Sequence, residues 1–343
     1  MNEADLTDFM EAFAQNKDFS GEIKTDENLS PYCTMHTGGR AKAFIEVFDE
    51  KSLAFAVKTA SLAGQKFFLL GGGSNVILPD EGLELVICTR KLGKDSPVSL
   101  SKKGVIRCSA GARWGTVLDF CKKNNLGGLE AFTSLSGTAG GAVFMNACCF
   151  SLAACDRLLT VRYLDTQKNE IFTYKTDKKD WGYKKSPFQP APEKLKGGVA
   201  GALPPQEGEA ENAAAVGVGG RLPPQVQKII LSAEFFVEEG FDENFCQEVR
   251  QKRIELGHFK APSAGSAFKN DPDKKITAGK LIDQCGLKGF SAGGAMVAPW
   301  HGNFIINPEQ KASSRDVRQL VEYVQKTVFE KTGTLLEPEI IFA

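Results

Sequence analysis

The sequence predicts an α+β protein built around loops of small residues. Patterns typical of strand, helix and strand follow one another over residues 43–70, and this order indicates a small α/β unit. Two loops interrupt apolar runs, at Gly71–Asn75 and Gly137–Asn146, and a third, Pro262–Asn270, lies in a separate C-terminal α+β unit. Glycine lets the chain turn sharply and approach another group closely. The prediction of the fold class therefore rests on the order of the elements and on these loops.

The N-terminal third carries alternating helix and strand patterns. Residues 1–30 are expected to form an N-terminal extension, with a helix that places Phe9 and Phe13 on one face before a polar lead-in. Apolar residues at helical spacing predict a second helix over Ser52–Leu62. Short apolar runs predict strands at Ala43–Val47, Phe67–Leu70, Leu85–Cys88 and Val105–Cys108.

The central part continues with a helix, a hairpin and a long polar stretch. A helix is predicted over Trp114–Lys123, and it is expected to end at Asn124-Asn125 and Gly127-Gly128. Two alternating segments, Leu158–Leu164 and Glu170–Tyr174, predict a β-hairpin. From about residue 190 to 224 the chain is rich in Gly, Pro, Ala and Glu without periodicity, so we expect a flexible insertion. A strand restarts at Lys228–Val237.

The C-terminal part predicts a separate α+β unit. Ser313 or Ser314 directly precedes its longest helical pattern and could cap that helix. The predicted helices are Asp242–Leu256, Ala278–Cys285 and Ser314–Lys331, with a strand at Phe304–Asn307.

Composition excludes several classes of function. Lys+Arg and Asp+Glu are each 42, so the net charge of +0 gives no basic field for nucleic acid. The N-terminus has no long apolar run, which excludes a signal peptide and a membrane span there. The nine cysteines form no C-x-x-C pair and indicate reduced thiols of a cytoplasmic protein. With three histidines, a metal centre is not expected.

The first two small-residue loops indicate an anionic ligand. Successive backbone N–H groups in glycine-rich loops form concavities that suit a phosphate or diphosphate. Taken singly, each loop could equally be a tight turn between two packed elements. Two such loops in one chain favour one long ligand that contains a diphosphate, such as a dinucleotide.

Seven blocks in order identify a resemblance to a known family. The chain resembles the UDP-N-acetylenolpyruvoylglucosamine reductases, flavoenzymes also called UDP-N-acetylmuramate dehydrogenases. The shared blocks cover nearly the whole chain except its ends and the insertion. They are Thr37-Gly38-Gly39, Leu70–Ile77, Gly137–Ala147, Gly182–Phe188, Pro262–Asn270, Gly286–Asn307 and Leu336–Glu339.

The resemblance implies an FAD-binding fold of the vanillyl-alcohol-oxidase type. Two α+β subdomains would bind the cofactor, at residues 31–108 and 109–237, and residues 238–343 would form an α+β substrate domain. The C-terminal segment of that domain would return to the active site. The C-terminal part has no room for the additional fold of the longer class in this family, so the chain resembles the second, shorter class.

The same resemblance implies a reaction in two steps during peptidoglycan precursor synthesis. NADPH would reduce FAD, and the reduced flavin would pass hydride to the enolpyruvyl double bond of the UDP-sugar, yielding UDP-N-acetylmuramate. Hydride addition leaves an enolate-like carbanion, so the site must stabilise negative charge and donate a proton. The glycine loops contain no His or Cys, so we expect FAD to be bound without a covalent link. The expected enzyme acts on small molecules as a monomer.

The resemblance also assigns site residues. Ser266 would donate the proton, and Glu339 and Lys184 would stabilise the enol. The substrate would be bound by Tyr183, Lys269 and Asn270. FAD would be held by Gly71, Gly72, Gly73, Ser74, Asn75, Gly137, Thr138, Gly140, Gly141 and Asn146.

Two positions depart from the family pattern. Lys184 stands where the family usually has Arg, and Lys offers one compact charge instead of a planar fork of donors. Lys185 takes the role instead if the alignment shifts by one residue. Met296 stands where Gln is expected, which removes a hydrogen-bonding group. Two alternatives therefore stay open: another FAD-dependent oxidoreductase of this fold, or a non-catalytic nucleotide-binding protein. The sequence leaves oligomeric state and the choice of NADPH over NADH undecided.

Overall fold

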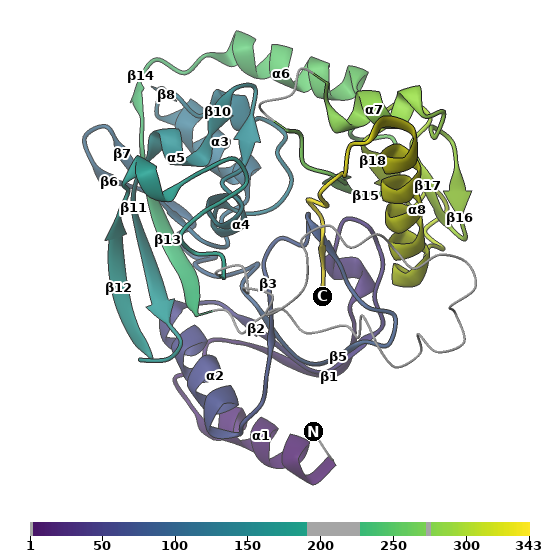
Figure 1. Ribbon diagram of the computed structural model, residues 1–343. Helices are drawn as coiled ribbons and strands as arrows, with labels where there is room; N and C mark the ends of the chain where they lie inside the picture. Colours follow the sequence, from purple (N-terminus) through teal and green to yellow (C-terminus); the bar gives the residue numbers. More distant parts are fainter. Residues whose placement is uncertain (1–2, 191–226, 272–275) are drawn as a thin grey trace.

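The computed structural model describes residues 3–190, 227–271 and 276–343 (Figure 1). The insertion expected at about residues 190–224 lies outside the described residues beyond Pro190. Three sheets surround the C-terminus of the chain, and helix α6 (Glu243–Glu255) crosses from the second sheet's side to that of the third (Figure 1).

The first sheet has the strand order β1-β2-β5-β3, antiparallel between β1 and β2 and parallel elsewhere. Helix α1 precedes it, and α2 connects β2 to β3. Its elements are α1 (Glu3–Gln15), β1 (Gly21–Asn28), β2 (Arg40–Val47), α2 (Glu50–Leu62), β3 (Phe68–Leu70) and β5 (Leu83–Cys88). The predicted helices and strands of this part are confirmed, with bounds that differ by up to three residues.

The polar lead-in expected before residue 30 is wrong, because strand β1 lies there and pairs with β2. Ile23 is the only large apolar residue of β1, and the remainder is mostly charged. This composition is typical of an edge strand, which needs to bury little and discourages further pairing. The first sheet therefore begins inside the residues expected to form an extension.

The second sheet is antiparallel, in the order β12-β11-β13-β7-β6. The predicted hairpin is confirmed as β11 and β12, and α3 has the predicted bounds. The expected boundary after residue 108 falls within β7, whose sheet already begins at Val98. Its strands are β6 (Val98–Lys102), β7 (Val105–Ser109), β11 (Leu158–Asp165), β12 (Glu170–Lys175) and β13 (Lys228–Phe236). Around it lie α3 (Trp114–Lys123), β8 (Leu126–Gly127), α4 (Ala139–Phe144), β9 (Cys148–Cys149), β10 (Leu152–Ala153), α5 (Ala154–Arg157) and β14 (Glu238–Glu239).

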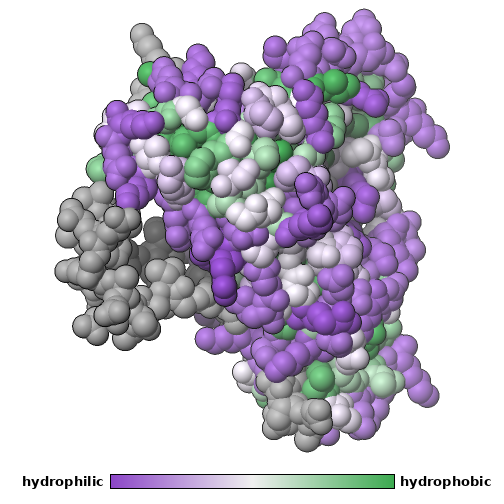
Figure 2. All heavy atoms as spheres, turned by 90° about the vertical axis from the view of Figure 1, so that its right-hand side faces the viewer, coloured by the Kyte–Doolittle hydropathy of each residue, from purple (hydrophilic) through white to green (hydrophobic). Residues whose placement is uncertain are grey.

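The third sheet, in the order β15-β18-β17-β16, is packed against α8. Ser313 caps α8 in a capping box with Asp316, while Ser314 instead bonds Asp80. Its elements are β15 (Ser263–Ser266), α7 (Ala278–Gln284), β16 (Ser291–Ala292), β17 (Ala295–Val297), β18 (Phe304–Ile306) and α8 (Ser314–Thr332). The side of the molecule that carries α8 is mostly hydrophilic, with smaller hydrophobic areas (Figure 2).

The first sheet is buried on both faces and joins two hydrophobic cores. Ile45 and Ile87 belong to the core shared with the second sheet, and Phe44 and Val86 to the core shared with α8. A strand buried on both faces needs a nearly continuous apolar sequence, as β2 and β5 have. The C-terminal unit therefore shares its core with the first sheet.

A buried asparagine also joins these units. The side chain of Asn307 is fully buried, and its Nδ2 donates to the Met35 carbonyl at 2.9 Å. Its Oδ1 accepts from the Ala312 amide at 2.9 Å, just before α8.

We expect Asn307→Ala to lower the free energy of unfolding by about 2–3 kcal/mol, because it leaves a buried carbonyl and a buried amide without partners. Urea denaturation measures this change. Glu309→Ala, which removes an exposed ion pair two residues away, should shift stability by less than about 0.5 kcal/mol. Equal effects of the two substitutions would contradict a coupling role for Asn307.

Candidate active site

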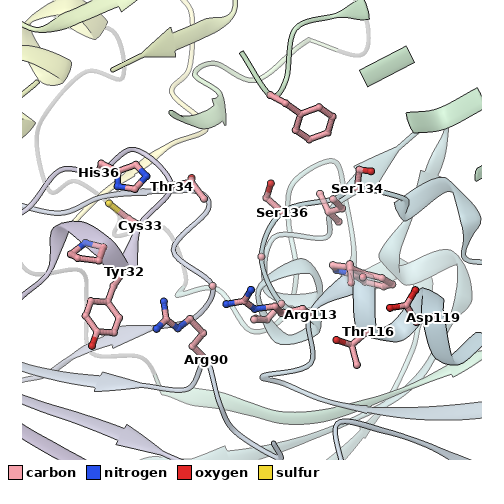
Figure 3. Close-up of a pocket in the computed structure, with 18 residues that line it drawn as sticks. Tyr32, Cys33, Thr34, His36, Arg90, Arg113, Thr116, Asp119, Ser134 and Ser136 are labelled. Atoms are coloured by element: carbon pink, nitrogen blue, oxygen red, sulfur yellow. The ribbon is translucent and has the colours of Figure 1, made fainter. Parts of the chain in front are cut away.

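A cavity of about 660 Å³ lies where the two glycine loops meet (Figure 3). One wall consists of residues 31–34, His36, Gly72 and Arg90. The other consists of the start of α3 and residues 134–138, and Phe259 also lines the cavity. The cavity thus lies between segments that belong to the first and second sheets.

Several glycines are required by the packing of the protein itself. A Cβ on Gly72 would lie 2.6 Å from the Gly137 Cα, so the two loops are in direct backbone contact. Gly73 has φ +68 and faces the Tyr32 carbonyl, and a Cβ on Gly140 would lie 2.7 Å from the Ala110 Cβ. By contrast, a Cβ on the exposed Gly141 would meet only the Thr138 hydroxyl, at 3.7 Å.

Two arginines, Arg90 and Arg113, line the cavity together with Asp119. Arg90 lies over the Tyr32 ring at 4.6 Å, with its Nε 3.7 Å from the Glu46 carboxylate. No carboxylate of the described residues pairs with Arg113, which occupies the N-cap position of α3 without a side-chain capping hydrogen bond. Both arginines lie in the lower part of the pocket as seen in Figure 3. The sequence reasoning missed both; the available signal was a cation two residues after a strand and another directly before a helix.

Glu339 is held at the junction of three segments. Its carboxylate lies 2.6 Å from the Lys184 Nζ, and both side chains are largely buried. Its amide donates to the Ala267 carbonyl at 2.8 Å, and its carbonyl accepts from the Asn75 Nδ2 at 3.1 Å. Just beyond it, β19 (Ile341–Phe342) pairs with β4 (Val76–Ile77). The C-terminal segment therefore lies against the first glycine loop.

Ser266 ends strand β15, next to the residue that binds the Glu339 amide. It pairs with Phe304 in the sheet and is partly buried. The adjacent segment is rigid, because the Asn303 side chain bonds both the amide and the carbonyl of Phe268, at 2.9 and 2.8 Å. No hydrogen-bond partner of the Ser266 hydroxyl occurs among the described residues. The structure thus brings Ser266, Lys184 and Glu339 together from three distant parts of the chain.

The turn that carries Lys184 is fixed by Asn146. Gly182 and Lys185 exchange backbone hydrogen bonds, and Lys184 adopts φ 55 between them. The Asn146 Nδ2 donates to the Gly182 carbonyl at 2.8 Å, and its Oδ1 accepts from the Cys155 amide at 3.1 Å. Burial on its own lowers the pKa of Lys184, but the Glu339 carboxylate outweighs this effect and raises that pKa. Lys184 is therefore a cation at neutral pH.

The three expected substrate-binding residues also lie together. The Asn270 amide donates to the Tyr183 hydroxyl at 3.4 Å, and the Asn270 Oδ1 accepts from the Ala278 amide at 3.0 Å. Lys269 forms an ion pair with Glu337. Met296 packs against a small apolar cluster that includes Phe304.

The cavity and the Lys184–Glu339 pair are adjacent but distinct. Gly72, Gly137 and Thr138 line the cavity, whereas Ser266, Lys184 and Glu339 do not. Asn75 links the two, since it follows the first glycine loop and bonds Glu339. Over the described ranges, no three His, Cys, Asp or Glu side chains gather as a metal site would require. Within those ranges, no helix combines the length and apolar character needed to cross a bilayer.

Comparison with known families identifies the class of protein. Residues 41–173 match the family model described as "FAD binding domain". The cavity fits this cofactor, because two glycine loops in backbone contact and two arginines suit its diphosphate. The chain therefore carries an FAD-binding domain in an α+β fold, as predicted.

Relatives define the particular family. Residues 257–343 match "UDP-N-acetylenolpyruvoylglucosamine reductase, C-terminal domain". A reductase of that name from Treponema denticola is 39% identical, over 94% of each chain. One from Borreliella burgdorferi is 34% identical, over 92% of this chain and 93% of the relative. The solved structure of the Thermus caldophilus reductase matches with a TM-score of 0.69 and 27% identity, over 94% of this chain and 99% of the other. The chain belongs to the UDP-N-acetylenolpyruvoylglucosamine reductase family.

Two glycine substitutions should separate packing from cofactor contact. We expect Gly72→Ala to lower the stability of the apoprotein by about 1–3 kcal/mol, because its Cβ collides with Gly137. Gly141→Ala should leave apoprotein stability unchanged but weaken FAD binding about tenfold or more, because its Cβ points into open space beside the second loop. Thermal melting of apoprotein and a flavin fluorescence titration measure the two effects. Normal FAD affinity in Gly141→Ala would remove that glycine from the cofactor site.

Proposed function

We propose that the protein catalyses NADPH-dependent reduction of UDP-N-acetylenolpyruvoylglucosamine to UDP-N-acetylmuramate for peptidoglycan synthesis. Membership of the family supports the substrate. The observation that carries the mechanism is the buried Lys184–Glu339 pair beside Ser266. In this proposal residues 238–343 form the substrate domain.

FAD would be held by the two glycine loops, together with Arg90 and Arg113. When bound, FAD supplies a hydride carrier between NADPH and the substrate. The backbone N–H groups of Gly71–Asn75 and of Gly137 and Thr138 would face a diphosphate, whereas those of Ala139 and Gly140 are bound to the carbonyls of Ala112 and Ala110. Asn75 would then position the cofactor site relative to Glu339, because its side chain bonds the Glu339 carbonyl.

Ser266 would donate the proton to the carbanion. Its hydroxyl O–H bond breaks as the new C–H bond of the product forms, and the serine oxygen is reprotonated afterwards. A serine hydroxyl is a weak acid, so this step needs a nearby cation. Lys184 is such a cation, and the segment that carries Glu339 is hydrogen-bonded to Ala267, next to Ser266.

Glu339 would act in two ways: it would hold Lys184 in place, and it would stabilise the developing enol. The ion pair fixes the ammonium within the site, where the low dielectric strengthens its effect on negative charge. Tyr183, Lys269 and Asn270 would contact the UDP-sugar. The two alternatives, a different FAD oxidoreductase or a non-catalytic nucleotide-binding protein, predict no reoxidation of reduced flavin by the enolpyruvyl substrate.

The two half-reactions test these roles. Ser266→Ala and Glu339→Gln should leave flavin reduction by NADPH unchanged and slow reoxidation by the enolpyruvyl substrate about 10²–10⁴-fold, the range for a lost general acid. Lys184→Ala should slow the same step, and Lys184→Arg should retain it. Stopped-flow absorbance measures both steps separately.

Ser263→Ala is the matched control, because Ser263 lies on the same strand at the end away from Glu339. It should slow neither step. Unchanged reoxidation in Ser266→Ala would exclude this serine as the proton donor, and equal slowing of both steps would indicate a damaged fold.

A further inference from the structure

One wall of the cavity carries polar groups that the protein itself does not use. Arg113, Thr116 and Asp119 line this wall from α3, and Figure 3 shows them in that order from the middle to the right. No hydrogen bond or ion pair of the Asp119 carboxylate occurs among the described residues. Trp114 also lines the wall, and its buried indole N–H has no hydrogen-bond partner in the described part of the chain. Unused donors and acceptors at a cavity wall indicate a ligand with complementary groups.

Phe259 lines the same cavity from the C-terminal unit, with its side chain 56% exposed. The turn before it is fixed. The Gly257 carbonyl accepts from the Trp300 Nε1 and from the Lys260 amide, each at 3.2 Å. A Cβ on Gly257 would lie 2.3 Å from the Trp300 ring. A large aromatic ring that a fixed turn leaves exposed in a cavity suits the flat face of a nucleobase.

The place of the cavity relative to the glycine loops indicates which half of FAD it suits. This step rests on the proposed function, in which the flavin faces Ser266. Gly72 and Gly137 line the cavity, whereas Ser266, Lys184 and Glu339 do not. With the diphosphate on the two loops, the flavin would extend toward Ser266, and the other half of the cofactor would extend into the cavity.

The groups along α3 follow the order of that adenosine half. Arg113 forms a β-bridge with Thr138 and so lies beside the second glycine loop. Thr116 is about one helical turn further along, and Asp119 lies about 9 Å beyond Arg113 at the rise of an α-helix. In the cofactor the ribose follows the phosphate, and the exocyclic amine of adenine is at the far end. A carboxylate only accepts hydrogen bonds, so it suits an amine.

We propose that this part of the cavity holds the adenosine half of FAD, with the Asp119 carboxylate accepting a hydrogen bond from the exocyclic amine of adenine. Phe259 would lie against the base, and Thr116 would face the ribose. Asp119 would then select adenine against a base that carries a carbonyl at the same position. Two acceptors that face each other share no hydrogen, and both lose their bonds to water.

Binding of two dinucleotides to the apoprotein tests the assignment without turnover. One is FAD, and the other is the analogue in which hypoxanthine replaces adenine, so that a carbonyl replaces the amine. The wild-type protein should bind FAD about 10- to 100-fold more tightly than the analogue. Asp119→Asn should bring the two affinities within about threefold, because its amide can also donate to the carbonyl. Phe259→Ala should weaken both dinucleotides about tenfold, because stacking does not distinguish the two bases. A flavin fluorescence titration measures each affinity.

Glu243→Gln is the matched control, because it removes an exposed carboxylate that pairs with Lys122 of α3 and does not line the cavity. It should alter neither affinity. Asp119 and Phe259 are both exposed, so their variants should fold. Equal affinities of the wild-type protein for the two dinucleotides, or an unchanged preference in Asp119→Asn, would overturn the proposal. Unchanged affinities in Phe259→Ala would overturn it too. Failure of the proposed function is distinguishable, since it would appear as absent flavin reoxidation in a protein that still selects FAD.

Discussion

The position of Glu339 is the constraint on which the rest of the site depends. One residue of the C-terminal segment bonds the first glycine loop through Asn75, the third small-residue loop through Ala267 and the Lys184 turn through its carboxylate. These three segments come from units that share no strand. Because a buried ion pair broken on one side leaves an uncompensated charge, displacement of Glu339 would destabilise all three together. The first glycine loop, the segment after Ser266 and the Lys184 turn are therefore held in one geometry.

That geometry is possible because the first sheet is buried on both faces. Its two cores fix the second sheet on one side and the α8 unit on the other, so the loops at its end face one another. Close packing makes such an interior stiff. The glycine loops add direct backbone contact, since Gly72 and Gly137 leave no space for a Cβ between them. The small residues there are needed for the packing of the fold itself, in addition to any contact with a ligand.

The sequence predicted the elements with clear apolar patterns and missed strand β1, which lacks one. Helix α3 and hairpin β11–β12 have strong periodicity; α3 has the predicted bounds, and each strand of the hairpin extends one residue further than predicted. Strand β1 was missed because it lies at the edge of its sheet, where charged residues are common. A local sequence pattern does not reveal an edge position. Resemblance predicted the group of Ser266, Lys184 and Glu339, which the structure brings together. Arg90 and Arg113 were not predicted, because their position at the cavity depends on tertiary packing and not on a local sequence pattern.

Charge balance explains how a lysine suits position 184. Lys184 and Glu339 neutralise each other's charge, so Lys184 holds the site together without attracting a substrate anion strongly. The pair also tolerates burial, because each charge compensates the other at 2.6 Å. A lysine at position 184 therefore keeps Glu339 in place, and the segment after Glu339 stays paired with the strand that follows the first glycine loop.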